Sequence, residues 1–138
     1  MNSRLVIPVI WVLAGALLVK LGSAWSQLPD RVAVHFGMNM QPNGWSSKNA
    51  LAATMLLIVV GQASLATWLI LGMTTSPAMI ATIQLVVSVV LVCAFWQVIN
   101  YNARGTPFQA MWMLVPMVLL FATITVFLLN LVFRYSRG

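Results

Sequence analysis

Four long apolar runs constrain this chain more than any other feature of its sequence. They extend from about residue 5 to 25, 50 to 73, 78 to 99 and 108 to 133. Each has roughly the length that an α-helix needs, at about 1.5 Å per residue, to cross a hydrocarbon core of about 30 Å. Every backbone polar group must be satisfied within such a segment, which isolated strands cannot achieve in lipid. We therefore expect four transmembrane helices.

The composition supports a membrane protein and argues against several other classes. Of the 138 residues, 62% are hydrophobic and only 6% are charged, which leaves too little polar surface to cover a water-soluble globule. Seven Lys and Arg residues against one acid give a net charge of +6, but the charges are scattered singly. This pattern is typical of residues near lipid headgroups, and it makes nucleic acid a poor partner. The single Cys93 cannot form a disulfide within the chain.

The lengths of the connections predict the topology. The second connection is very short and the third covers only residues 100–107, so both force antiparallel neighbours, whereas the first covers residues 26–49. We predict an all-α polytopic membrane protein. It would be a single domain, residues 1–138, built as an antiparallel four-transmembrane-helix bundle with a long ordered loop between helices 1 and 2. The first run also imitates a secretory signal peptide ending at residues 22–24, but we expect it to be retained.

The polar residues inside the expected spans are neutral. We interpret them as groups that form hydrogen bonds between helices, rather than as the lining of a polar conduit. Small residues at helical spacing would let two backbones approach closely. The candidate residues for helix packing are Gly15, Gly61, Ser64 and Ser88.

The first loop contains the rarest ionisable groups of the chain. Asp30 is its only acid and His35 is its only histidine. A catalytic pair would also need a nucleophile and an orienting group, and one histidine with one aspartate supplies too few ligands for a metal. We therefore predict no catalytic residue, no metal site and no cofactor, and we expect that the protein is not an enzyme.

The same loop has a clear local pattern. Pro29 follows the first span, and residues 31–36 alternate polar and apolar side chains, which favours an extended segment on an apolar surface. The Gln-Pro-Asn-Gly sequence at residues 41–44 predicts a turn. Ser46 or Ser47 could cap the second helix.

Residues 28–48 combine prolines, a histidine and a tryptophan at a distinctive spacing. Nine positions fit the pattern LP-x-x-V-P-x-H-F-x-x-x-G-x-P-D-x-W-x-S-K, namely Leu28, Pro29, Val32, His35, Phe36, Pro42, Trp45, Ser47 and Lys48. This stretch resembles a bacterial membrane domain of unknown function, which also opens the SdpI-like immunity proteins against the SDP killing peptide. Three positions differ, because Ala33 replaces a proline, Met40 a glycine and Asn43 an aspartate. The resemblance covers about residues 5–50.

The resemblance implies a multi-pass protein of the bacterial cytoplasmic (inner) membrane, with its termini in the cytoplasm. It also implies that the first loop recognises a partner outside the membrane. The candidate recognition residues are His35, Phe36, Pro42, Trp45 and Lys48. The expected partners are the lipid bilayer and a membrane protein or peptide, and a homo-oligomer is compatible with the sequence.

Three functions remain open at this stage. The first is a non-enzymatic, immunity-like membrane protein whose loop binds a peptide, a lipid headgroup or a partner protein. The second is a structural accessory subunit that packs along a larger bacterial membrane complex through its helix faces. The third is a pore or transporter formed by oligomerisation, in which neutral glutamines line the path. Those glutamines would be Gln62, Gln84 and Gln97.

Overall fold

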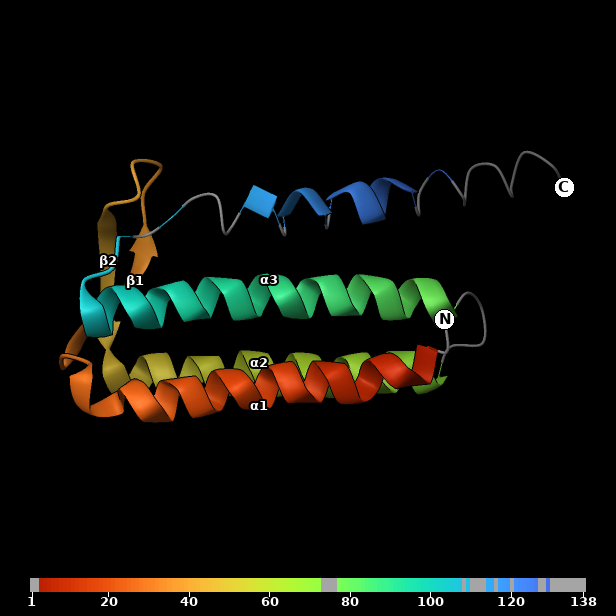
Figure 1. Cartoon of the computed structure of the whole chain (residues 1–138), viewed down its shortest axis with the longest axis horizontal. Helices are drawn as coiled ribbons and strands as arrows, with labels where there is room; N and C mark the ends of the chain where they lie inside the picture. The colour runs from red at the N-terminus through yellow and green to blue at the C-terminus, as the bar shows by residue number, and fades with distance from the viewer. Residues whose placement is uncertain are drawn as a thin grey trace, which may run out of the picture.

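Three long helices and a β-hairpin form the described part of the chain (Figure 1). The computed structural model describes residues 3–72, 77–107, 109, 114–115, 117–119, 121–126 and 129. The helices are α1 (Val6–Ala24), α2 (Lys48–Gly72) and α3 (Pro77–Arg104), and short 3-10 turns, η1 (Ser3–Leu5) and η2 (Trp25–Gln27), flank α1. The strands β1 (Arg31–Phe36) and β2 (Pro42–Ser47) pair antiparallel.

The three helical spans are each long and apolar enough to cross a bilayer. They are Ser3–Gln27, Lys48–Gly72 and Pro77–Arg104. The chain is therefore a mostly helical, multi-pass membrane protein, as predicted from its apolar runs. The predicted fourth span, residues 108–133, lies largely outside the described residues, so the four-helix bundle stays a prediction.

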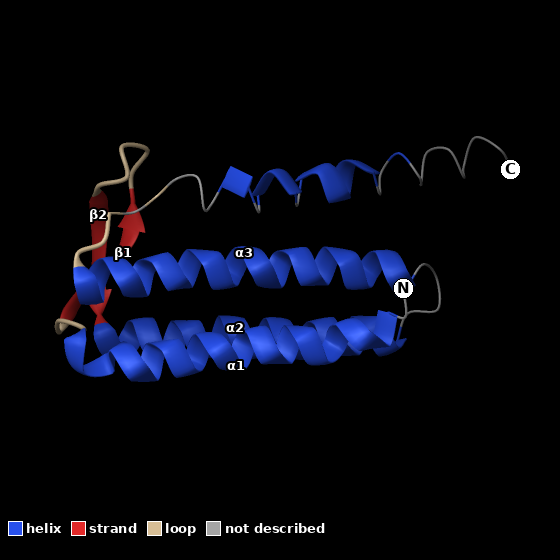
Figure 2. Cartoon of the chain, viewed as in Figure 1, coloured by secondary structure: helices blue, strands red, loops and turns tan. Residues whose placement is uncertain are grey.

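The hairpin departs from the all-α prediction, which placed an ordered loop between the first two helices. It lies at one end of the molecule, where α1 ends, α2 begins and α3 ends (Figure 2). β1 contacts both α2 and α3, and α1 packs against both other helices. We call α1, α2 and α3 the helical body, and the two strands with the helix ends around them the hairpin end. α3 also continues to Arg104, past the predicted end of its span at residue 99.

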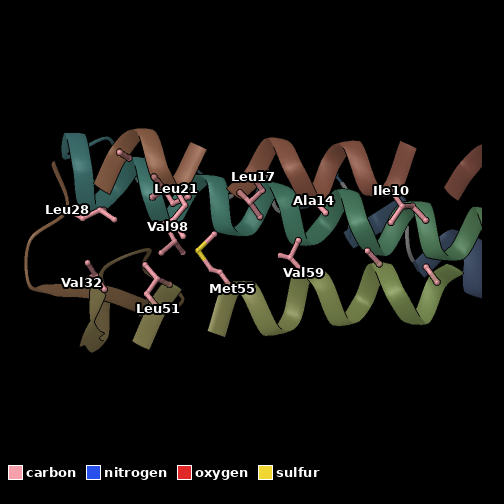
Figure 3. Close-up of a cluster of buried hydrophobic side chains, with 14 of the residues drawn as sticks. Ile10, Ala14, Leu17, Leu21, Leu28, Val32, Leu51, Met55, Val59 and Val98 are labelled. Carbon is pink, nitrogen blue, oxygen red and sulfur yellow. The ribbon is translucent and has the colours of Figure 1, made fainter. Parts of the chain in front are cut away.

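A stripe of buried side chains runs along α1 and along α2 of the body (Figure 3). Successive members are three or four residues apart, which places them on one helix face. In α1 and α2 they are Val6, Ile10, Ala14, Leu17, Leu21, Ala24, Leu51, Met55, Val59, Ala63, Ala66 and Ile70. Ala63, Ala66 and Ala81 are completely buried, and such small residues let helix backbones approach closely in a membrane.

The opposite helix faces carry large apolar side chains that remain exposed. Val19, Leu57 and Trp68 are each about 70% exposed or more. In water such surfaces would be costly, but lipid tails are as apolar as these side chains. The exposed faces therefore fit the surroundings of a bilayer.

Three of the four predicted packing residues do not lie where the described helices meet. Gly15 and Gly61 have no neighbouring atom within 4 Å of the position of an added Cβ, and Ser64 is exposed. Ser88 does lie in the contact and is 5% exposed. Between the described helices, the completely buried alanines Ala63, Ala66 and Ala81 lie at the close approach instead.

Neutral polar side chains link the helices. Gln62 of α2 donates from Nε2 to Oε1 of Gln84 on α3 at 3.0 Å, and the Ser88 hydroxyl lies 3.1 Å from Gln62 Oε1. Between α1 and α2, the Trp11 indole N–H donates to Thr67 Oγ1 at 3.0 Å. These contacts agree with the interpretation of the polar residues as interhelical hydrogen-bonding groups.

Candidate recognition site at the hairpin end

The turn of the hairpin lies earlier than the sequence predicted. Met40 N donates to Gly37 O and Gly37 N donates to Gln41 O, each at 2.9 Å, so residues 38–40 form a three-residue loop. Met40 closes this loop with a φ of 58°, the left-handed conformation that such loops require at that position. The turn predicted at residues 41–44 is therefore wrong, because these residues lie almost entirely in β2. β1, by contrast, has the bounds predicted for the extended segment.

Gly44 is needed for close approach of the strands rather than for a turn. It pairs with His35, and a Cβ added to Gly44 would lie only 2.7 Å from the His35 Cβ. Real Cβ atoms do not approach each other so closely, so any larger residue would push the strands apart. The pairing is also irregular on both sides of His35. Irregularities of this kind bend a strand and re-aim its side chains.

Asn102 on α3 holds the outer edge of β1. Its Oδ1 accepts from Ala33 N at 2.7 Å and its Nδ2 donates to Ala33 O at 2.8 Å. The side-chain amide thus occupies the place of a neighbouring strand. Ala33 is completely buried. Because proline has no N–H, only a residue such as alanine can make both bonds with Asn102.

Apolar contacts pack the hairpin against the helical body. Val32 is completely buried and Leu28 is 4% exposed. The ring of Phe36 meets the ring of Tyr101 edge to face, with 5.0 Å between centroids. Such pairs add roughly 0.5–1.5 kcal/mol beyond the area that they bury. The hairpin is therefore attached to α3 through both a hydrogen-bonded and an aromatic contact.

The start of α2 is stabilised by residues of the matched pattern. Ser47 Oγ accepts from Ala50 N at 3.1 Å, which confirms the predicted helix cap. Lys48 Nζ lies 3.1 Å from Asp30 Oδ1 and 5.6 Å from the centroid of the Trp25 ring. Asp30 is 95% exposed, so the ion pair is a surface interaction worth about 1 kcal/mol at most.

Two predicted recognition residues remain exposed on the hairpin. The His35 imidazole is exposed, and its Nδ1 forms a 2.6 Å hydrogen bond with Asn43 Oδ1. Trp45 is 51% exposed although it lies within β2. The other three candidates, Phe36, Pro42 and Lys48, are partly buried and help to hold the hairpin.

Among the described residues the sheet has two strands, so the edge of β2 that faces away from β1 is free, and this edge passes along Trp45. Ala33 and Trp45 are register partners, and both backbone groups of Ala33 are directed at Asn102 rather than at β2. Directly opposed residues of this kind form a pair without mutual hydrogen bonds. The N–H and C=O of Trp45 therefore also point outward, from the other edge of the sheet. An edge of this type can accept a further strand.

Asn102 and Tyr101 are the residues of this site that sequence reasoning missed. They were placed in the third connection, residues 100–107, and Asn102 lies 69 positions from Ala33. Nothing local in the sequence links residues so far apart. The absence of proline at position 33 is the signal that could have prompted a search for an amide partner.

Metal-ligating side chains do not gather into a cluster in the part of the chain that the structure describes. No group of three or more His, Cys, Asp or Glu side chains there could hold a metal ion. The exposed groups at the hairpin end are instead an imidazole, an indole and backbone amides. These groups are suited to binding by hydrogen bonds and apolar contact.

Comparison with known proteins shows a similarity over the first part of the chain. Residues 7–60 match the family model described as Domain of unknown function (DUF1648). The matched range covers α1, the hairpin and the first half of α2. No curated protein matches the chain. No solved structure matches it either.

Proposed function

We propose that this protein is a non-enzymatic, immunity-like membrane protein whose hairpin end binds an extended peptide segment. The peptide adds as a third strand to the free edge of β2, and its side chains contact Trp45 and His35. In this proposal the hairpin lies outside a bacterial cytoplasmic membrane and the termini lie in the cytoplasm. The resemblance to immunity proteins against a killing peptide supports a peptide as the partner.

The observation that carries the proposal is the position of Trp45. Its indole is half exposed on a strand whose neighbour is fixed to α3 through Asn102, so it is presented on a well-supported surface. Its backbone N–H and C=O point away from β1. Strand addition uses such backbone groups for affinity and side chains for specificity. Aromatic residues on supported surfaces often dominate the energy of binding.

The direct test places a photoreactive phenylalanine derivative at position 45 in native bacterial membranes. We expect a covalent adduct with a peptide or with an extended segment of a protein. The matched control carries the same group in place of Trp68, which is 69% exposed on α2. Adducts with lipid alone at both positions would contradict the proposal. Reproducible crosslinking of position 68 to one particular protein would instead support the accessory-subunit hypothesis.

The mode of binding can be tested with proline. The N–H of Trp45 faces the free edge, whereas that of Ser46 faces β1 through its pairing with Val32. Trp45→Pro removes the backbone N–H of residue 45, a donor that only the partner uses. It should therefore reduce crosslinking of the partner to a photoreactive residue elsewhere on β2 more than Trp45→Ala does. The two variants should be equally stable. Equal binding by both would show that the side chain, and not the backbone, recognises the partner.

A further inference from the structure

A cavity of about 390 Å³ lies on the C-terminal half of α3, outside the proposed peptide site. α3 contributes Val92, Trp96, Gln97 and Asn100 to its walls, and the following segment contributes Pro107. The volume falls within the range of pockets that hold small ligands, roughly 300–1,000 Å³. The cavity runs along α3 from Val92 to Asn100 and continues past the end of that helix, where Thr106, Pro107 and Gln109 complete its lining.

Two buried polar atoms at this cavity lack a hydrogen-bond partner among the described residues. They are Nε2 of Gln97 and Oδ1 of Asn100. The orientation of the Gln97 amide is determined, because its Oε1 accepts from Gln109 N at 2.9 Å and only an oxygen can do so. The cavity therefore offers one amide donor and one carbonyl acceptor. Buried polar atoms left unpaired cost about 1–3 kcal/mol each, so a ligand that pairs both gains affinity.

Positive charge lies beside the same cavity. Lys20 of α1 places its Nζ 4.9 Å from the centroid of the Trp96 ring, which lines the cavity. Arg104 ends α3, one helical turn after Asn100 of the cavity wall. The only acid of the chain, Asp30, is paired with Lys48 instead. No acidic side chain of this protein thus balances the two cations, and an external anion would do so.

We propose that this cavity binds an anionic phospholipid whose headgroup carries hydroxyl groups, of the phosphatidylglycerol type. Its acyl chain lies against the apolar wall, and an ester carbonyl accepts a hydrogen bond from Gln97 Nε2. A headgroup hydroxyl donates to Asn100 Oδ1, and the phosphate faces Lys20 and Arg104. The site is independent of the hairpin edge.

The test compares three lipids with identical acyl chains on the purified full-length chain, using native mass spectrometry. Phosphatidylglycerol carries both the charge and the hydroxyl donors, phosphatidic acid lacks the headgroup glycerol, and phosphatidylcholine has neither net charge nor a hydroxyl. We expect affinity to fall in that order, by roughly tenfold for each lost interaction. Equal affinity for all three lipids would overturn the proposal, and this comparison requires no variant.

Variants then assign each interaction to its residue. Asn100→Leu should lower the affinity for phosphatidylglycerol roughly tenfold, to that for phosphatidic acid, and leave phosphatidic acid unchanged. Lys20→Met should weaken both anionic lipids but not phosphatidylcholine. Gln97→Met should weaken all three equally. Thr54→Val, an exposed position on α2, is the matched control and should change none. Helix content measured by circular dichroism identifies any variant that fails to fold, and unchanged selectivity in folded Asn100→Leu and Lys20→Met would also overturn the proposal.

Discussion

The helical body and the hairpin end are held together in different ways. The body packs along stripes of apolar side chains, and completely buried alanines such as Ala63 and Ala81 set the distance between helices. The hairpin end depends on individual contacts, such as the Asn102 amide on Ala33 and the close approach of Gly44 to His35. The body should therefore tolerate single substitutions, because each contact is one of many. Single substitutions at the hairpin end should have larger effects.

The largest effect is expected from Asn102→Leu. This change removes both hydrogen bonds to Ala33 and leaves a buried N–H and C=O unpaired, which should weaken the attachment of the hairpin by about 3 kcal/mol. Hydrogen exchange of the Ala33 amide in detergent micelles should then be roughly 100-fold faster. Thr82→Val is the control on the same helix, since Thr82 Oγ1 donates only to Ala78 O of its own helix. Unchanged protection of Ala33 would contradict the role of Asn102.

The second-largest loss of stability is expected from Gly44→Ala. The added Cβ would overlap the His35 Cβ, and overpacking of this kind costs about 2 kcal/mol. We expect a lower thermal midpoint and a changed fluorescence of the neighbouring Trp45. Gly15→Ala is the matched control, because no atom lies within 4 Å of its added Cβ. The double variant Gly44→Ala with His35→Gly should regain most of the lost stability, because it removes the His35 Cβ. If it does not, the overlap with the His35 Cβ is not the cause of the loss.

Met40→Gly should stabilise the hairpin by up to about 1 kcal/mol. Met40 has a φ of 58°, a conformation that costs a residue with a side chain about 1 kcal/mol and glycine very little. Chemical unfolding monitored through Trp45 fluorescence measures the gain. A loss of stability would show that the Met40 side chain itself contributes to the hairpin.

The sequence predicted the helical body well, because the length and hydrophobicity of each span are local properties. It predicted the hairpin end in part. The alternation of residues 31–36 identified β1, and the Ser47 cap was read from its position before α2. The turn was misplaced, since Pro42 and Gly44 are turn residues in general but here begin a strand and permit a close approach. The contact of Asn102 with Ala33 could not be predicted, because it joins two distant segments that only the packing of α3 brings together.

The smallest loss of stability is expected when a polar contact inside the helical body is removed. Gln62→Leu removes hydrogen bonds to Gln84 and Ser88, yet we expect a loss of only about 0.6 kcal/mol in unfolding experiments in mixed micelles. The reason lies in the reference state, because a helix that separates from its neighbours within a membrane lets its polar side chains find other partners. A double-mutant cycle with Ser88→Ala isolates the pairwise energy. A coupling above about 2 kcal/mol for this single contact would contradict the comparison, because the body would then depend on individual contacts at least as strongly as the hairpin end does.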